Sequence, residues 1–318
     1  MTSIHSRKPA GIRIAPGILF GFCLLMTPLS IDRLFAHAQT AKTATGIVAP
    51  GAKLVLLADG FKFTEGPAAD AKGNVFFTDQ PNNRILDWSV DGKLSVFKND
   101  SGRSNGLYFD EAGNLYACAD LNNQLWEISP SGKVSVLVKN YKGKKLNGPN
   151  DLWVHPNGGI YLTDPFYKRD YWTRGPMEQD GQDVYYLSPD HKKLTRVIDD
   201  LEQPNGIIGT PDGKRLYVAD IKGNKTYTYR INGDGTLSDK KIFVEMGSDG
   251  MTIDDEGDVY LVGKGVTVFN SQGEKIDYIA IEKPWTGNIT FGGKDKSKLF
   301  ITASDSLYSI QTRVHGTR

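Results

Sequence analysis

The sequence predicts an all-β protein, a six-bladed β-propeller in which an N-terminal strand closes the last blade. Composition is the first observation: 35 glycines and 14 tyrosines among 318 residues favour short strands and tight turns over long helices. Repetition is the second, because one pattern recurs about every 40 to 55 residues. The third is that the last copy lacks one strand, for which a matching segment stands near the N-terminus.

Each repeat begins with a side-chain oxygen placed immediately before a short β-like run. These six residues, here called the register residues, are Glu65, Asn105, Asn150, Asn205, Asp249 and Asn288. In the first repeat three further β-like runs follow, joined by Gly-Asn and Asp-Gly turns, and the second repeat copies this order. Four strands joined by hairpin turns make one antiparallel blade, and a period near 40 residues is typical of propellers.

The sixth repeat holds only three β-like runs, at 288–291, 299–302 and 307–310. Segment 53–57, Lys-Leu-Val-Leu-Leu, resembles the fourth run of the earlier repeats. Pairing the two ends of the chain would close the ring and remove its open edges. We therefore expect a single propeller domain over residues 53–318, preceded by a flexible leader over residues 39–52.

Residues 1–38 have the order of a secretory signal peptide: basic residues, an apolar run over 14–26, and Ala36-His37-Ala38 before Gln39. We expect cleavage near Ala38 and export to the periplasm or the medium; an uncleaved membrane anchor is the alternative. The remaining chain would carry nearly balanced charge, which gives no reason to expect nucleic acid or a membrane as a partner. No obligate protein partner is evident.

The register residues begin the innermost strand of each blade, so their side chains should converge near one mouth of the propeller axis. Two carboxylates and four amides, with no His or Cys, form an oxygen-only set. Such a set favours one hard divalent cation, Ca²⁺ first, with Mg²⁺, Mn²⁺ or Zn²⁺ as other possibilities. The alternative is that Asn and Asp stand there only as turn residues, which does not explain the Glu at position 65.

Several of these motifs resemble the senescence-marker/gluconolactonase (regucalcin-like) family, and its bacterial gluconolactonases most. The motifs are Glu65-Gly66-Pro67, Asn147-Gly148-Pro149-Asn150-Asp151, Thr163-Asp164-Pro165, Gln203-Pro204-Asn205-Gly206 and Asp249-Gly250-Met251. The similarity covers about residues 54–310. It implies a divalent cation held by Glu65, Asn150, Asn205 and Asp249, with Asn105 as a contact to substrate or to the ligands.

The chain departs from the family pattern at two places. Animal members have an Arg where this chain has Gly148, and many bacterial relatives have Glu-His where it has Ala119-Asp120. Substrate contacts at these positions therefore do not carry over.

A second series of acids stands at the ends of the second strands. Its members are Asp79, Asp120, Asp164 and Asp220. We expect most of them to hold loops by accepting backbone N–H hydrogen bonds. Asp164 is the expected exception and a candidate substrate contact, because an aromatic and Arg-bearing insertion begins beside it.

This insertion separates the second and third strands of the third repeat, over residues 165–182. It should emerge at the same mouth as the register residues. Its Tyr167 and Arg174 are candidate substrate contacts, since aromatic and charged side chains on a loop can stack on or hydrogen-bond a sugar. A simple surface hairpin is the alternative.

The predicted function is a metal-dependent hydrolase that opens a sugar lactone, an aldonolactone such as glucono-1,5-lactone. The cation would polarise the carbonyl and lower the pKa of a water. Asp249 is the candidate catalytic residue that takes the proton, and Glu65 would be chiefly a ligand. Two alternatives stay open: a phosphotriesterase-like hydrolase on the same metal, and a non-catalytic ligand-binding propeller with a structural ion.

Overall fold

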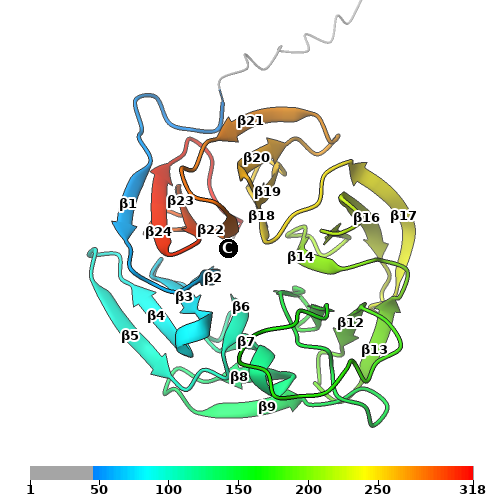
Figure 1. The fold of residues 1–318 in the computed structure, drawn as a ribbon. Coiled ribbons are helices and arrows are strands. Elements are labelled where there is room, and N and C mark those ends of the chain that lie inside the picture. The colour runs from blue at the N-terminus through cyan, green and yellow to red at the C-terminus, as the bar shows by residue number, and fades with distance from the viewer. Residues whose placement is uncertain (1–45, 318) are drawn as a thin grey trace, which may run out of the picture. The chain divides into compact units, whose positions relative to one another are not determined.

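The computed structural model describes residues 46–317, which form six four-stranded antiparallel sheets. In five sheets the strands follow chain order from the innermost to the outermost. Figure 1 shows the inner strands arranged around a common axis, with the outer strands at the rim. The predicted six-bladed propeller is confirmed. The predicted signal peptide lies outside the described residues.

The first three blades contain twelve strands. Blade 1 comprises β2 (Thr64–Ala69), β3 (Val75–Asp79), β4 (Arg84–Trp88) and β5 (Leu94–Asn99). Blade 2 comprises β6 (Ser104–Phe109), β7 (Leu115–Ala119), β8 (Gln124–Ile128) and β9 (Val134–Val138). Blade 3 comprises β10 (Leu152–Val154), β11 (Ile160–Asp164), β12 (Asp183–Leu187) and β13 (Leu194–Ile198). Two short 3-10 helices follow β3 and β7, namely η1 (Gln80–Asn82) and η2 (Asp120–Asn122).

The other three blades complete the ring. Blade 4 comprises β14 (Pro204–Gly209), β15 (Arg215–Asp220), β16 (Lys225–Ile231) and β17 (Leu237–Val244). Blade 5 comprises β18 (Met251–Ile253), β19 (Val259–Gly263), β20 (Gly265–Phe269) and β21 (Lys275–Ile279). Blade 6 comprises β22 (Thr286–Gly292), β23 (Lys298–Ala303), β24 (Ser306–Gln311) and, as its outermost strand, β1 (Val55–Ala58).

The ring is closed as the sequence predicts, because β1 pairs antiparallel with β24. The packed chain begins earlier than expected, however. Ile47 is buried with Ile310 and Val314, and Val48 forms a β-bridge with Thr312. The described part of the predicted flexible leader, residues 46–52, therefore lies against blade 6 rather than loose.

The hydrophobic core lies between neighbouring blades. Its largest cluster joins residues of blades 3, 4 and 5, and the other clusters likewise bring together residues of adjacent sheets. Each blade thus buries its faces against the next, which is how a chain of this length forms one ring. None of the helices within residues 46–317 has the length and apolar character needed to span a membrane.

Neighbouring inner strands approach closely at the register positions. A Cβ on Gly66, which follows register residue Glu65, would lie 2.0 Å from the carbonyl oxygen of Asn105. Nearby, the Gly106 N–H donates to the carbonyl oxygen of Asn150 at 2.7 Å. A glycine after the register residue therefore lets one inner strand pack directly against the next.

A comparison of two glycine substitutions tests this close packing. Gly66 and Gly60 both have positive φ, +48° and +82°, but no atom lies within 4 Å of a Cβ on Gly60. We expect Gly60→Ala to lower the free energy of unfolding by about 1 kcal/mol. Gly66→Ala should cost at least about 2 kcal/mol more, because the added methyl group meets backbone. Urea unfolding measures both, and equal losses would show that the neighbouring strand gives way.

Candidate active site

The six register residues are buried around the axis, each no more than 8% exposed. Contacts between neighbouring blades join several of them. Asn288 Nδ2 donates to Glu65 Oε2 at 3.1 Å, which links blade 6 to blade 1. The Asn205 side chain lies near enough to Asp249 to lower the pKa of that carboxyl, which brings blades 4 and 5 together here. The structure thus brings together the side-chain oxygens that the sequence pattern selects.

Acids at the ends of the second strands hold the loops that present the register residues. Three of these acids each accept hydrogen bonds from two backbone N–H groups. The donors are the residues that stand three positions and two positions before the register residue of the same blade. The distances are 3.1 and 3.4 Å from Lys62 and Phe63 to Asp79, 2.8 Å from Asn147 and Gly148 to Asp164, and 2.9 Å from Glu202 and Gln203 to Asp220. Asp164 has both oxygens occupied in this way and is fully buried. The structure therefore gives it a loop-holding role in place of the expected substrate contact.

Asp120, in blade 2, is the exception in this series. In blade 2 the loop before register residue Asn105 is held by Asn83 instead, whose Oδ1 accepts a hydrogen bond from the Arg103 N–H at 2.7 Å. Asp120 is left to bind the insertion: it accepts from the Tyr171 hydroxyl at 2.8 Å, and Arg169 Nε lies 3.7 Å away. The acid that breaks the loop-holding pattern thus ties the insertion of blade 3 to blade 2.

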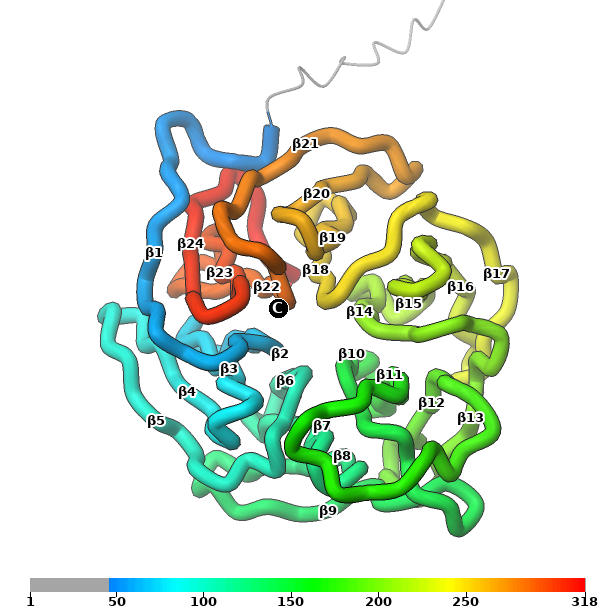
Figure 2. Tube along the Cα trace, in the orientation of Figure 1, coloured from blue at the N-terminus to red at the C-terminus, as the bar shows by residue number. Residues whose placement is uncertain are grey.

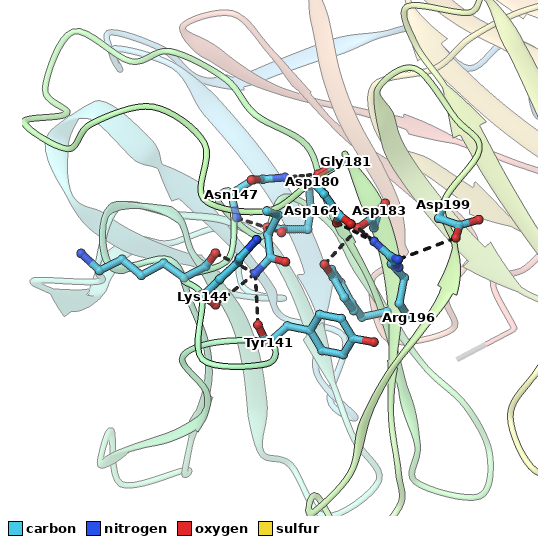
Figure 3. Close-up of polar contacts among 12 residues, drawn as sticks. Tyr141, Lys144, Asn147, Asp164, Asp180, Gly181, Asp183, Arg196 and Asp199 are labelled. Atoms are coloured by element: carbon cyan, nitrogen blue, oxygen red, sulfur yellow. Dashed lines mark hydrogen bonds and ion pairs between the residues drawn. The ribbon is translucent and has the colours of Figure 1, made fainter.

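The returning end of the insertion is fixed to its own blade. Asn147 Nδ2 donates to the carbonyl oxygens of Asp164 and Gly181, at 3.0 and 2.8 Å. Arg196 of β13 forms an ion pair with Asp180 at 2.7 Å. Figure 3 shows these contacts converging on the base of the insertion. The segment therefore leaves blade 3 from a rigid base.

The first half of the insertion contacts two other blades. The Tyr167 hydroxyl accepts a hydrogen bond from Asn205 Nδ2, in blade 4, at 2.8 Å. Because Tyr171 is bonded to Asp120 in blade 2, the segment spans from blade 2 to blade 4. Figure 2 shows it passing in front of β7 and β8. The insertion therefore contacts register residue Asn205 and is not a hairpin directed away from it.

Sequence reasoning missed Asp151, a third buried carboxylate at the axis. It is 6% exposed, and its Oδ2 lies 3.4 Å from the same Asn288 amide that binds Glu65. A signal was present: blades 1, 2, 4 and 5 have Gly immediately after the register residue, whereas blade 3 has this Asp. Its Oδ1 lies 2.5 Å from where a Cβ on Gly106 would be, so the carboxylate fills space that the neighbouring glycine leaves open.

Trp285 is a second residue that the pattern did not reveal. Its indole Nε1 donates to Asp249 Oδ2 at 2.5 Å and fixes that oxygen. The tryptophan has no counterpart in the other repeats, so no repeated motif pointed to it.

The axis beyond the register residues contains a cavity of about 70 Å³. Residues of all six inner strands line it, Asp151 and Asn288 among them, and so do Gly316 and Thr317. Gly316 bridges to Asp254, and Figure 1 places the end of the chain at the centre of the ring. Asp151 thus lies between the register residues and this cavity.

Comparison with known proteins identifies the family of the chain. Residues 63–305 match the family described as the SMP-30/Gluconolactonase/LRE-like region. The chain belongs to this family. A gluconolactonase of Zymomonas mobilis is 29% identical over 293 residues, which cover 82% of each protein.

Two solved structures extend the comparison. A structure described as a putative gluconolactonase has a TM-score of 0.80 at 33% identity and covers 86% of this chain and 96% of its own. A gluconolactonase of Xanthomonas campestris has a TM-score of 0.78 at 30% identity and covers 84% of this chain and 91% of its own.

The carboxylates of this SMP-30/gluconolactonase propeller are poorly compensated by the protein. Burial raises the pKa of Asp249 to about 6 and that of Asp151 to about 8. Burial also raises the pKa of Glu65 well above its ordinary value, and the negative charges of Asp249 and Asp151 raise it further. Hydrogen bonds from Gly66 and Asn288 to Glu65 oppose this shift. Three acids so close together and so deeply buried call for a compensating positive charge.

A divalent cation fits this set of residues. Within residues 46–317, none of the three carboxylates has a Lys or Arg nitrogen within 4.0 Å. The Oδ1 of Asn105 is buried and finds no hydrogen-bond partner in the same range. In that part of the chain no three His, Cys, Asp or Glu side chains could hold an ion alone, so amide oxygens would have to complete the ligand set. Mixed carboxylate and amide oxygens suit Ca²⁺.

Metal removal should therefore lower the melting temperature. An ion that binds only the folded chain, present at about 100 times its Kd, adds about 2.7 kcal/mol. For a chain of this size we expect a difference of about 5 °C or more between EDTA and millimolar Ca²⁺. Glu65→Gln should reduce the difference, and Glu111→Gln, at an exposed turn, should keep it. Identical melting curves in EDTA and Ca²⁺ would contradict a cation site.

Proposed function

We propose that the chain is a lactone hydrolase that opens a sugar lactone such as glucono-1,5-lactone with the help of one divalent cation, Ca²⁺ in the first place. The observation that carries the proposal is the set of three buried carboxylates at the axis, two of which share the Asn288 amide. Membership of the family supports it, as do the gluconolactonases of Zymomonas mobilis and Xanthomonas campestris, which are similar over more than four-fifths of this chain.

The ligands of the cation would be Glu65, Asn150, Asn205 and Asp249, as the family resemblance implies. Their two carboxylates balance the charge of a divalent ion, and their four side chains leave room in a Ca²⁺ shell of six to eight oxygens for water and substrate. When bound, the ion supplies a Lewis acid that polarises the lactone carbonyl and lowers the pKa of water.

Asp249 is placed to move the proton. Trp285 holds its Oδ2 at 2.5 Å, so the orientation of the carboxylate is fixed. The other oxygen can accept a proton from the water whose oxygen adds to the carbonyl carbon. The same proton then passes to the ring oxygen as the ring C–O bond breaks, which yields the open hydroxy acid.

Residues of the mouth bind and orient the sugar. The unpartnered Oδ1 of Asn105 can accept a hydrogen bond from a sugar hydroxyl. Tyr167 of the insertion presents its hydroxyl beside register residue Asn205, and Arg174, stacked on Trp172, would offer a guanidinium from the same segment. The insertion also limits the entry of bulk water, which strengthens the polar contacts beneath it.

Replacing Asp249 by Asn tests the role of the carboxylate. The amide keeps the size of the side chain and one ligand oxygen but cannot take up the proton. At saturating metal we expect kcat for glucono-1,5-lactone to fall at least about 100-fold, with the melting temperature little changed. Proton release followed with a pH indicator, corrected for spontaneous hydrolysis, gives the rate. Asp91→Asn, at an exposed turn, is the control and should keep the full rate.

Near-normal turnover in Asp249→Asn would remove Asp249 as the base. The wild-type chain decides between the proposed function and its alternatives. Faster hydrolysis of a fluorophosphate than of any lactone would indicate a phosphotriesterase-like enzyme. Metal binding with no hydrolysis of either substrate would indicate a ligand-binding propeller with a structural ion.

A further inference from the structure

The insertion brings two cations, Arg169 and Arg174, close to acids of the mouth. Arg169 and Arg174 act on the buried carboxylate of Asp120, and Arg103 lies 4.1 Å over the ring of Tyr171, which is bonded to that same carboxylate. The other acid that Arg174 faces, Asp164, has both its oxygens taken by backbone N–H groups. Asp120 and Asp164 therefore offset part of this positive charge, and Arg169 also lowers the pKa of Asp249. What these acids leave unmet is the hydrogen-bonding capacity of the guanidinium groups.

Several of these guanidinium nitrogens lack a hydrogen-bond acceptor. Arg174 Nε and Nη2 are buried and have none among residues 46–317. Arg169 Nε is also buried without an acceptor in this range, because the Asp120 carboxylate lies 3.7 Å away, beyond hydrogen-bond distance. Buried donors without acceptors cost free energy, and donors that are charged cost more than neutral ones. Such groups are expected where a ligand supplies the missing acceptors.

Aromatic rings hold both guanidinium planes in place. Arg174 lies 3.3 Å over the ring of Trp172, and Arg169 lies 4.7 Å over the ring of Tyr167. Stacking of this kind occupies a face of the guanidinium and leaves the N–H groups at its edge free. That edge is a planar fork, which matches the two oxygens of a carboxylate or of a phosphate.

The cations lie beside the proposed reaction site and have room next to them. Tyr167, on which Arg169 stacks, accepts the hydrogen bond from register residue Asn205. Arg174 lines a cavity of about 270 Å³ together with Lys145 and Asn147. The Oδ1 of Asn147 has no partner in the described part of the chain. Glu178 also lines the cavity, and its Oε2 accepts a hydrogen bond from the Lys145 N–H at 2.8 Å. The cavity therefore offers cationic donors and the Asn147 acceptor to a substituent of several atoms, with one carboxylate engaged at its wall.

We propose that Arg169 and Arg174 of the insertion bind an anionic substituent of the substrate, so that the preferred lactone carries a carboxylate or a phosphate ester away from its reacting carbonyl. This inference rests on the proposed lactone hydrolysis and adds the substrate class. The arginines are specificity-determining residues for the reaction carried out at the register residues.

Two matched pairs of lactones test the proposal. Glucono-1,4-lactone and glucaro-1,4-lactone share a ring and differ by a carboxylate at C6. Glucono-1,5-lactone and its 6-phosphate differ by a phosphate ester at the same carbon. In at least one pair we expect kcat/KM to be about 10-fold or more higher for the anionic member, and the pair that shows it identifies the group. Added salt should reduce the preference, because it screens the charges.

Variants connect the preference to the arginines. Arg174→Gln or Arg169→Gln should lower the anionic-to-neutral ratio of kcat/KM by about 10-fold, whereas Lys168→Gln, an exposed cation on the same segment, should keep it. Equal kcat/KM for both members of each pair would overturn the inference alone, since neutral lactones would still be hydrolysed. A ratio that survives both arginine variants would overturn it as well. Failure of the wild type to hydrolyse any lactone would overturn the proposed function and this inference together.

Discussion

The structure depends on three carboxylates buried side by side at the axis of a propeller. Glu65, Asp151 and Asp249 come from blades 1, 3 and 5, and burial raises the pKa of each. Like charges that are buried close together repel one another, so the three carboxylates destabilise the folded chain unless a cation or bound protons compensate their charge. A fold that keeps such a cluster needs rigid backbone around it, and much of the surrounding structure supplies that rigidity.

Rigidity comes from features that repeat with the blades. The acid at the end of a second strand holds the loop before the register residue, and the glycine after that residue lets the next inner strand pack closely. Function is concentrated where the repeat is broken. Asp151 replaces a glycine, Asp120 releases its loop to bind the insertion, and the insertion itself occurs in one blade alone. These departures from the repeat place a cluster of carboxylates at the axis and two arginines on one side of it.

The repeat explains how much could be predicted from the sequence. The six blades, the closing strand and the six register residues follow from periodicity, because each copy places the same residue at the same position of the same strand. Asp151 could have been recognised as a substitution within that pattern. Trp285 could not, since its contact with Asp249 depends on how one loop folds. The sequence could not show that Asp164 holds its loop while Asp120 binds the insertion, because both acids end equivalent strands and only the loop contacts distinguish them.

A single titration tests most directly whether the buried acids form one cation site that serves lactone hydrolysis. The metal-free chain is titrated with Ca²⁺, and bound Ca²⁺ and the rate of glucono-1,5-lactone hydrolysis are measured in the same samples. We expect the rate to rise in proportion to bound Ca²⁺ and to reach its maximum at one ion per chain. A full rate in the metal-free chain, or one bound ion with no gain in rate, would contradict it.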